Sequence, residues 1–158
     1  MIKPADPVVL LPEGARVRWL ASFPKSGNTW VRAFLANLLA PQEGRALTLG
    51  EISAMPFYTD QSAVEAPPHR EFFGKAHYMY TPEIHGDLPA VYIMRDPLDI
   101  VPSAADFFGV SHARMATEVA RDWPKHVNSW LAHCKIILRY ENMPDNFHAL
   151  AQEMNVPD

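Results

Sequence analysis

Residues 22–30 combine residue types that suit the binding of an anion. They read Ser-Phe-Pro-Lys-Ser-Gly-Asn-Thr-Trp and follow the mainly apolar run 17–21. They lead into residues 29–39, where apolar side chains recur on one face of a helix. The order is therefore strand, tight loop and helix. Such a loop presents backbone N–H groups at the positive end of a helix dipole, which predicts a phosphate or sulfate site.

The side chains of this loop each suit a role beside an anion. Lys25 supplies a mobile positive charge, and Gly27 lets the backbone come close to an oxyanion. Ser26 and Thr29 can donate hydrogen bonds from their hydroxyl groups. The loop is not a Walker P-loop, because Lys25 precedes the glycine. An ordinary nucleoside triphosphatase is therefore disfavoured. For Lys25 taken alone, the alternative to anion binding is a solvated lysine in a loop.

A second candidate anion site begins at Arg95. This residue follows residues 90–94, an apolar run of strand length, and Ser103 comes eight residues later on a predicted helix. An arginine can hold a phosphate in two parallel hydrogen bonds. The alternative for Arg95 is a salt bridge to Asp96, the predicted N-cap of the helix, or to Asp99 in its first turn.

These two motifs resemble those of the sulfotransferases that use 3′-phosphoadenosine 5′-phosphosulfate (PAPS). The family's loop usually reads PKSGTTW, and residues 24–30 read PKSGNTW. On this resemblance Arg95 and Ser103 hold the 3′-phosphate of the donor. The loop residues bind its 5′-phosphosulfate, and Lys25 also stabilises the leaving phosphate oxygen. The loop residues are Lys25, Ser26, Gly27, Asn28, Thr29 and Trp30, with Asn28 in place of the family's first threonine.

Two further motifs match the family in the same order along the chain. Lys75-Ala76-His77 resembles the family's Lys-x-His, in which the histidine is the general base. Residues 135–140 resemble the family's strand that ends in Tyr-Glu. In the family this tyrosine, which corresponds to Tyr140, lies against the adenine of the donor. Trp30 corresponds to the family's other neighbour of the adenine. The alternatives are a histidine without chemistry, since the chain has seven, and core packing for Trp30.

The resemblance implies transfer of a sulfuryl group from PAPS to a hydroxyl or amine of a small-molecule acceptor, with no metal. His77 and Lys25 are the implied catalytic residues. The acceptor pocket is expected from residues 45–74, with Lys75, Phe57 and Tyr58 as candidate binding residues. A plain core role is equally open for the two aromatic residues. Phenols, alcohols, amines and sugars all remain open as acceptors.

Two other function classes stay open. One is a nucleotide-binding module of the same fold that transfers nothing. The other is an ATP-dependent small-molecule kinase. Two features disfavour a kinase: Lys25 precedes the glycine, and no magnesium-binding Asp stands at the end of residues 91–95. The family also has a later Arg-Lys-Gly loop, which does not follow Tyr140 here. We therefore expect 1–158 to be a single sulfotransferase-like domain that lacks the family's C-terminal part.

Composition limits the partners. The 158 residues are 48% hydrophobic and 20% charged, as in a soluble globular domain, and the net charge of -4 argues against nucleic acid. The single Cys134 excludes an internal disulfide and is interpreted as a buried thiol on a helix. Without an apolar run of about 18 residues or a signal peptide, we expect no membrane partner and a cytoplasmic protein. A homodimer would cover an exposed edge or helix face.

The predicted elements alternate between strands and helices. This order indicates an α/β fold of three layers, with a central, mostly parallel sheet and helices on both faces; the resemblance implies a P-loop NTPase-like form. Parallel strands end at one edge, so Lys25, His77, Arg95 and Tyr140 should meet in one crevice. The predicted strands are 17–21, 73–77, 90–95 and 135–140, and the predicted helices are 29–39, 97–108, one from about Ser111 that is interrupted at Pro124, and 145–155.

Overall fold

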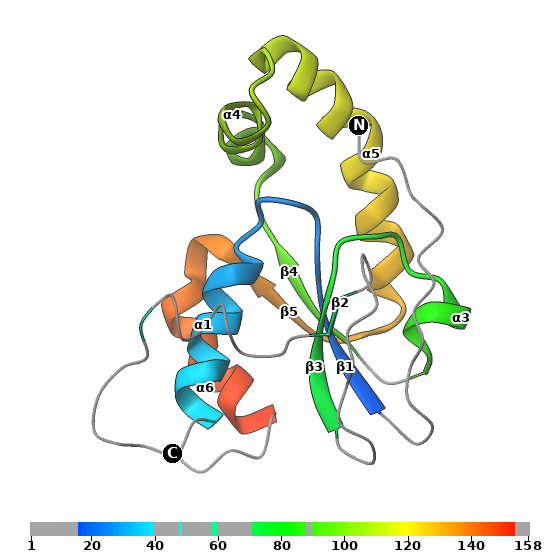
Figure 1. The fold of residues 1–158 in the computed structure, drawn as a ribbon, viewed down its shortest axis with the longest axis vertical. Coiled ribbons are helices and arrows are strands. Elements are labelled where there is room, and N and C mark those ends of the chain that lie inside the picture. The colour runs from blue at the N-terminus through cyan, green and yellow to red at the C-terminus, as the bar shows by residue number, and fades with distance from the viewer. Residues whose placement is uncertain (1–15, 40–47, 49–57, 60–70, 88–89, 154–158) are drawn as a thin grey trace.

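The computed structural model of the chain describes residues 16–39, 48, 58–59, 71–87 and 90–153 (Figure 1). In chain order its elements are β1 (Arg16–Ser22), α1 (Asn28–Leu39), β2 (Tyr58–Thr59), β3 (Glu71–Ala76), α3 (Pro82–His85), β4 (Ala90–Met94), α4 (Pro97–Phe108), α5 (His112–Leu131), β5 (Cys134–Arg139), the 3₁₀ turn η1 (Tyr140–Asn142) and α6 (Met143–Glu153).

The strands form one sheet in the order β2-β3-β1-β4-β5, and every neighbouring pair is parallel. Four strands have five to seven residues, and β2 adds two residues at one edge. The chain leaves β1 toward β3 on one side and later reaches β4 on the other side. The C-terminal end of β1 is therefore the point where the strand order reverses, which is where ligands bind in open α/β sheets.

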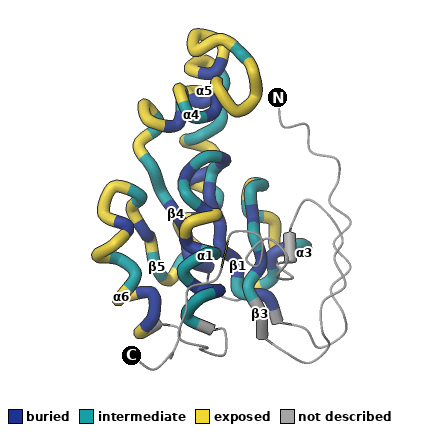
Figure 2. Tube along the Cα trace, turned by 60° about the vertical axis from the view of Figure 1, so that its left-hand side comes forward, coloured by how far each residue is buried: buried dark blue, intermediate teal, exposed yellow. Residues whose placement is uncertain are grey.

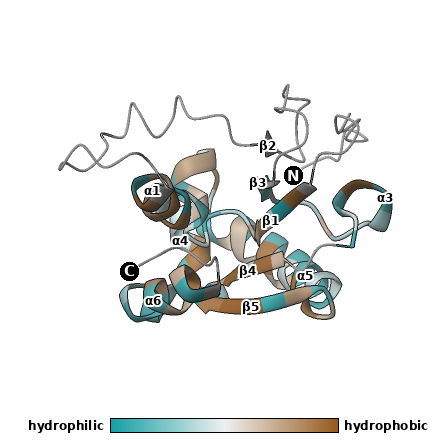
Figure 3. Cartoon of the chain, turned by 90° about the horizontal axis from the view of Figure 1, so that it is seen from below, coloured by the Kyte–Doolittle hydropathy of each residue, from teal (hydrophilic) through white to brown (hydrophobic). Residues whose placement is uncertain are grey.

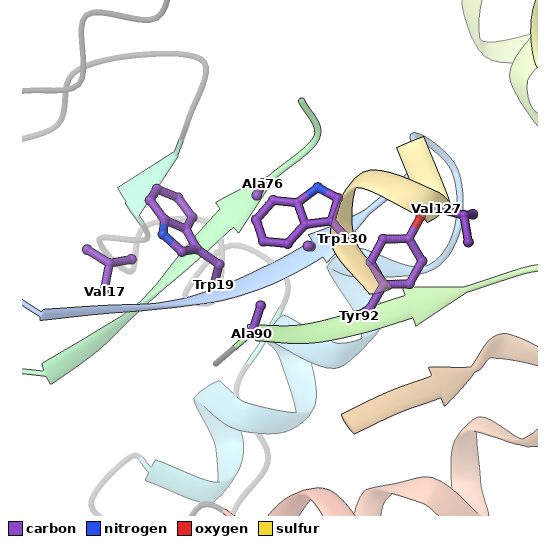
Figure 4. Close-up of a cluster of buried hydrophobic side chains, with 8 residues drawn as sticks. Val17, Trp19, Ala76, Ala90, Tyr92, Val127 and Trp130 are labelled. Atoms are coloured by element: carbon purple, nitrogen blue, oxygen red, sulfur yellow. The ribbon is translucent and has the colours of Figure 1, made fainter. Parts of the chain in front are cut away.

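Helices cover both faces of the sheet, so the predicted α/β fold with a layered parallel sheet is confirmed (Figures 1 and 3). Side chains alternate along β1 because successive residues of a strand point to opposite faces. Trp19 packs with Trp130 of α5 on one face, as Figure 4 shows. Leu20 packs on the other face with Leu35 of α1 and Leu150 of α6. The central strands β1 and β4 are mostly buried, whereas the edge strand β5 and the outer sides of α4, α5 and α6 carry exposed residues (Figure 2).

The predicted break at Pro124 is wrong, because α5 runs without interruption from His112 to Leu131. A proline removes one hydrogen bond from the interior of a helix. Here Met115 and Val119 precede Pro124 and pack against α4, while Val127 and Trp130 follow it and pack on the sheet. Both halves of α5 thus bury one continuous face, and that burial outweighs the loss of one backbone bond.

The predicted position of Cys134 on a helix is also wrong. The helix ends at Leu131, and Cys134 is the first residue of β5. Its thiol is half-buried rather than buried, and Sγ lies 3.0 Å from the carbonyl oxygen of Trp130. Burial raises the pKa of this thiol to about 12. The other strands and helices named above lie within a few residues of their predicted positions, while the four-residue α3 was not predicted.

Candidate functional site

The loop between β1 and α1 is folded tightly on itself. The N–H of Ser26 donates to the carbonyl of Phe23 over 3.2 Å, which closes a turn directly after the strand. Lys25 has φ 68° and Gly27 has φ 95°, so both lie in the left-handed region. A lysine is uncommon there, and such strained residues gather at binding sites. The loop therefore forms a compact turn between the end of β1 and the start of α1.

Between Ser26 and Trp30, three backbone N–H groups are open. Within the described part of the chain, the N–H groups of Gly27, Asn28 and Thr29 have no protein partner. Those of Ser26 and Trp30 are occupied, because Ser26 donates to Phe23 and Trp30 donates to the carbonyl of Gly27 over 2.9 Å. The N–H groups of Gly27, Asn28 and Thr29 are therefore available to bind an anion. They lie at the positive end of α1, whose first turn has no acidic residue.

The side chain of Asn28 points into the protein. Its Nδ2 donates to the carbonyl of Leu20 over 2.8 Å and to the hydroxyl of Ser22 over 3.2 Å. Asn28 is only 4% exposed, and Ser26 is fully buried. Inside the described residues, Asn28 Oδ1 and Ser26 Oγ are buried without a hydrogen-bond partner. Asn28 therefore holds the loop against β1, and its backbone N–H is the group that it can offer a ligand.

Tyr140 packs directly onto this loop. A Cβ added at Gly27 would lie 2.5 Å from Cδ2 of Tyr140, so only a glycine fits beneath the ring. Trp30 faces the same tyrosine, with ring centroids 5.8 Å apart, and its indole is 45% exposed. The predicted pair Trp30 and Tyr140 thus comes together beside the loop, with an exposed aromatic surface on which a flat ring can stack.

Arg95 also lies against the loop. Its Nη1 donates to the carbonyl of Lys25 over 3.0 Å, and its Cζ lies 4.2 Å from the centroid of the Tyr140 ring. Among the described residues Arg95 makes no ion pair with Asp96 or Asp99. The structure therefore does not contain the salt bridge that was the alternative interpretation of Arg95. Asp96 caps α4 as predicted, since its Oδ1 accepts from the N–H of Leu98 over 2.8 Å.

Helix α4 borders the loop on a further side. The Nζ of Lys25 lies 4.1 Å from the centroid of the Phe107 ring, a cation–π contact between the loop and α4. Ser103 is half-buried on the same helix. Within the described contacts it forms no hydrogen bond with Arg95, so their sharing of one phosphate stays a prediction.

His77 follows β3 and is tied to the end of β1. Its Nδ1 lies 2.8 Å from the carbonyl oxygen of Ser22 and 3.2 Å from Ser22 Oγ. A carbonyl can only accept, so Nδ1 carries the hydrogen and Nε2 carries the lone pair of the neutral ring. The hydroxyl of Ser22 also accepts from Asn28. A short chain of hydrogen bonds thus connects the start of α1 to the histidine.

A cavity of about 820 Å³ opens beside His77. It lies between the loop after β1, the segment after β3, and the helices α4 and α5. His126 also lines it, and its Nδ1 lies 2.8 Å from the hydroxyl of Tyr92. Burial raises the pKa of that tyrosine.

Most of residues 45–74, from which the sequence predicted an acceptor pocket, fall outside the described residues. Lys75 lies in β3 and does not line the cavity, Tyr58 begins β2, and Phe57 falls outside the described residues. From the sequence, the apolar residues of α4 and α5 that line the cavity could be predicted only as core residues.

Comparison with known proteins adds no family assignment. No protein-family model matches the chain, and no curated protein matches it. Within the described residues no helix combines the length and the apolar character needed to cross a membrane. The same residues hold no group of three or more His, Cys, Asp or Glu side chains placed to share a metal ion. What this site does must therefore be argued from its geometry.

Proposed function

We propose that this chain is a sulfotransferase that moves a sulfuryl group from PAPS to a hydroxyl or amine acceptor. We further propose that its parallel sheet is of the P-loop NTPase-like kind, with the β1–loop–α1 unit as the phosphate-binding element. One observation carries the proposal: the guanidinium of Arg95 bonds the backbone of Lys25, so two candidate phosphate sites share one crevice.

The donor would extend across this crevice. The open N–H groups of Gly27, Asn28 and Thr29 support binding of the 5′-phosphosulfate at the start of α1. Arg95, on the neighbouring strand end, supports binding of the 3′-phosphate. The exposed indole of Trp30 suits the adenine. The positive charge of Lys25 would stabilise the phosphate oxygen that leaves, which is the charge that grows in the transition state.

The transfer would proceed in line. The acceptor oxygen attacks the sulfur, and the bond between sulfur and the bridging oxygen of the 5′-phosphate breaks with its electron pair on that oxygen. The acceptor proton passes to Nε2 of His77, whose Nδ1–H is held by the carbonyl of Ser22. The products are a sulfate ester and adenosine 3′,5′-bisphosphate. Because His77 lines the cavity, an acceptor seated there would reach the base.

Two experiments test this proposal. Calorimetric titration with adenosine 3′,5′-bisphosphate should show binding, and radiolabelled PAPS should pass its sulfuryl group to an added phenol. Binding without transfer to any phenol, alcohol or amine would instead support a nucleotide-binding module. Turnover of ATP with magnesium, with no response to PAPS, would support a kinase.

A further inference from the structure

Glu141 follows Tyr140 in the Tyr-Glu motif and has no part in the proposed transfer. Its Oε1 accepts a hydrogen bond of 2.8 Å from the backbone N–H of Asp96, 45 positions earlier in the chain. We infer that Glu141 is a positioning residue for the 3′-phosphate site, because this bond holds the backbone that carries Arg95. The inference rests on the proposed function, since it adds a residue to that same donor site.

The bonded N–H belongs to the peptide unit that joins Arg95 to Asp96. A peptide unit is planar, so a bond to its N–H also restrains the carbonyl group and the Cα of Arg95. This unit lies between β4, which ends at Met94, and α4, which begins at Pro97. Within the described part of the chain its N–H makes no backbone hydrogen bond. The carboxylate of Glu141 is therefore the group that holds this peptide in place.

The start of α4 differs from a helix that caps itself. In a capping box, the side chain at the third helical position accepts from the N–H of the N-cap residue. The N-cap here is Asp96 and the third position is Asp99, but the bond goes to Glu141 at the end of β5. A bond within α4 would cap the helix without tying it to another strand. Glu141 instead connects α4 to the segment whose Tyr140 ring lies 4.2 Å from Arg95 Cζ.

The backbone of Glu141 is itself held on both sides. The Tyr140 carbonyl accepts from the N–H of Met143, which closes the turn, and Met143 is fully buried in the core. The Tyr140 ring packs on the loop after β1. The side chain of Glu141 is exposed, so its bond to Asp96 stabilises the site only if little conformational freedom is lost in forming it. A fixed backbone reduces that loss.

The guanidinium of Arg95 keeps hydrogen-bond donors for a phosphate. Its Nη1 donates to the carbonyl of Lys25, and its Nε is buried without a protein partner among the described residues. Two parallel bonds to a phosphate require both donors to meet their oxygens, so a small shift of Arg95 would lose one of them. In the same residues Glu141 forms no ion pair with Arg95. Glu141 thus places the arginine without neutralising its charge.

Amide exchange on the full chain tests the bond itself, without any nucleotide. The N–H of Asp96 should exchange at least about threefold faster in Glu141→Ala than in the wild type. Glu141→Gln keeps a side-chain oxygen that can accept, so its Asp96 N–H should exchange almost as in the wild type. Glu83→Ala removes an exposed carboxylate from the first turn of α3 and is the matched control. Unchanged exchange in Glu141→Ala would overturn the inference.

Calorimetric titration of the same variants with adenosine 3′,5′-bisphosphate and with AMP tests the positioning role. We expect Glu141→Ala to bind the bisphosphate about three- to tenfold more weakly, to bind AMP within about twofold of the wild type, and Glu141→Gln to recover most of the loss. Glu83→Ala should bind both nucleotides like the wild type. A Glu141→Ala protein that loses stability but keeps its affinity for the bisphosphate would limit Glu141 to capping α4, and equal weakening for both nucleotides would also overturn the inference.

The wild-type titration separates this inference from the proposed function. If the wild type does not bind the bisphosphate, the sulfotransferase proposal fails, and the role of Glu141 fails with it. If the wild type binds it and Glu141→Ala binds it equally well, the donor assignment stands and the role of Glu141 is wrong. Binding that Glu141→Ala weakens and Glu141→Gln restores would support both.

Discussion

The guanidinium of Arg95 donates a hydrogen bond of 3.0 Å to the backbone carbonyl of Lys25, although the two residues are 70 positions apart in the chain. This bond ties the end of β4 to the loop after β1. It also brings together the two segments that carry the phosphate-binding motifs, at the point where the strand order reverses. The predictions below for Gly27, Asn28, His77 and Arg95 concern this arrangement or the residues around it.

Replacement of Gly27 tests the packing of Tyr140 on the loop. Gly27→Ala places a methyl group in the left-handed region and 2.5 Å from the Tyr140 ring. We expect it to lower the free energy of unfolding by about 1–3 kcal/mol more than Gly109→Ala does. Gly109 also has positive φ, 65°, but a Cβ added there would meet nothing within 4 Å, so it controls for backbone strain. Equal losses in urea denaturation would contradict the close packing.

Replacement of Asn28 tests its structural role at the start of α1. Asn28→Ala removes two buried hydrogen bonds, to Leu20 and Ser22, and we expect a loss of about 1–3 kcal/mol in the free energy of unfolding. Asn37→Ala, on the same helix, removes a bond that the side chain donates locally to Ala33 and should cost less stability than Asn28→Ala, since alanine is the better helix former. Thermal and urea denaturation of both variants measure the difference; similar effects would refute it.

His77→Ala tests the base assignment. With 2-naphthol and PAPS as substrates, we expect kcat to fall by about 10²–10⁴, while the affinity for adenosine 3′,5′-bisphosphate stays unchanged. The control is His112→Ala, whose imidazole lies at the surface beside Asp106, 3.7 Å away, and which should leave kcat unchanged. Full activity of His77→Ala would remove the histidine from the reaction.

The thiol of Cys134 should be unreactive in the folded chain. Burial raises its pKa from 9.0 to about 12, so the folded state disfavours the thiolate. Its contribution to stability is therefore complete below pH 9 and is lost as the pH rises toward 12. At pH 8 we expect alkylation by iodoacetamide to be two to three orders of magnitude slower, roughly, than in urea-unfolded chain. Equal rates would show that the thiol is exposed.

Most of the strands and helices that position the site could be predicted from the sequence. Local patterns predicted β1, α1, β4 and α4, because apolar periodicity and the Asp96 cap act over a few residues. The meeting of Lys25, His77, Arg95 and Tyr140 at one edge also follows, since parallel strands end on the same side of a sheet. Which backbone N–H groups stay open does not follow, because it depends on the turn at Ser26.

The rest depends on contacts between distant segments. Pro124 does not break α5, because residues on both sides of it bury one face, and this burial is decided by α4 and the sheet. The cavity likewise lies between the loop after β1, the segment after β3, α4 and α5, which are far apart in the chain. Met115 and Val119 have the helical spacing of ordinary core residues, so the sequence has no signal that they also line a cavity.

The central claim is that Arg95 holds the 3′-phosphate of a nucleotide whose 5′ end lies over α1. It is tested most directly by titrating wild type and Arg95→Ala with adenosine 3′,5′-bisphosphate and with AMP, which lacks only the 3′-phosphate. We predict that the variant binds the bisphosphate at least about tenfold more weakly and binds AMP almost as the wild type does. Equal weakening for both nucleotides, or none for either, would contradict the claim.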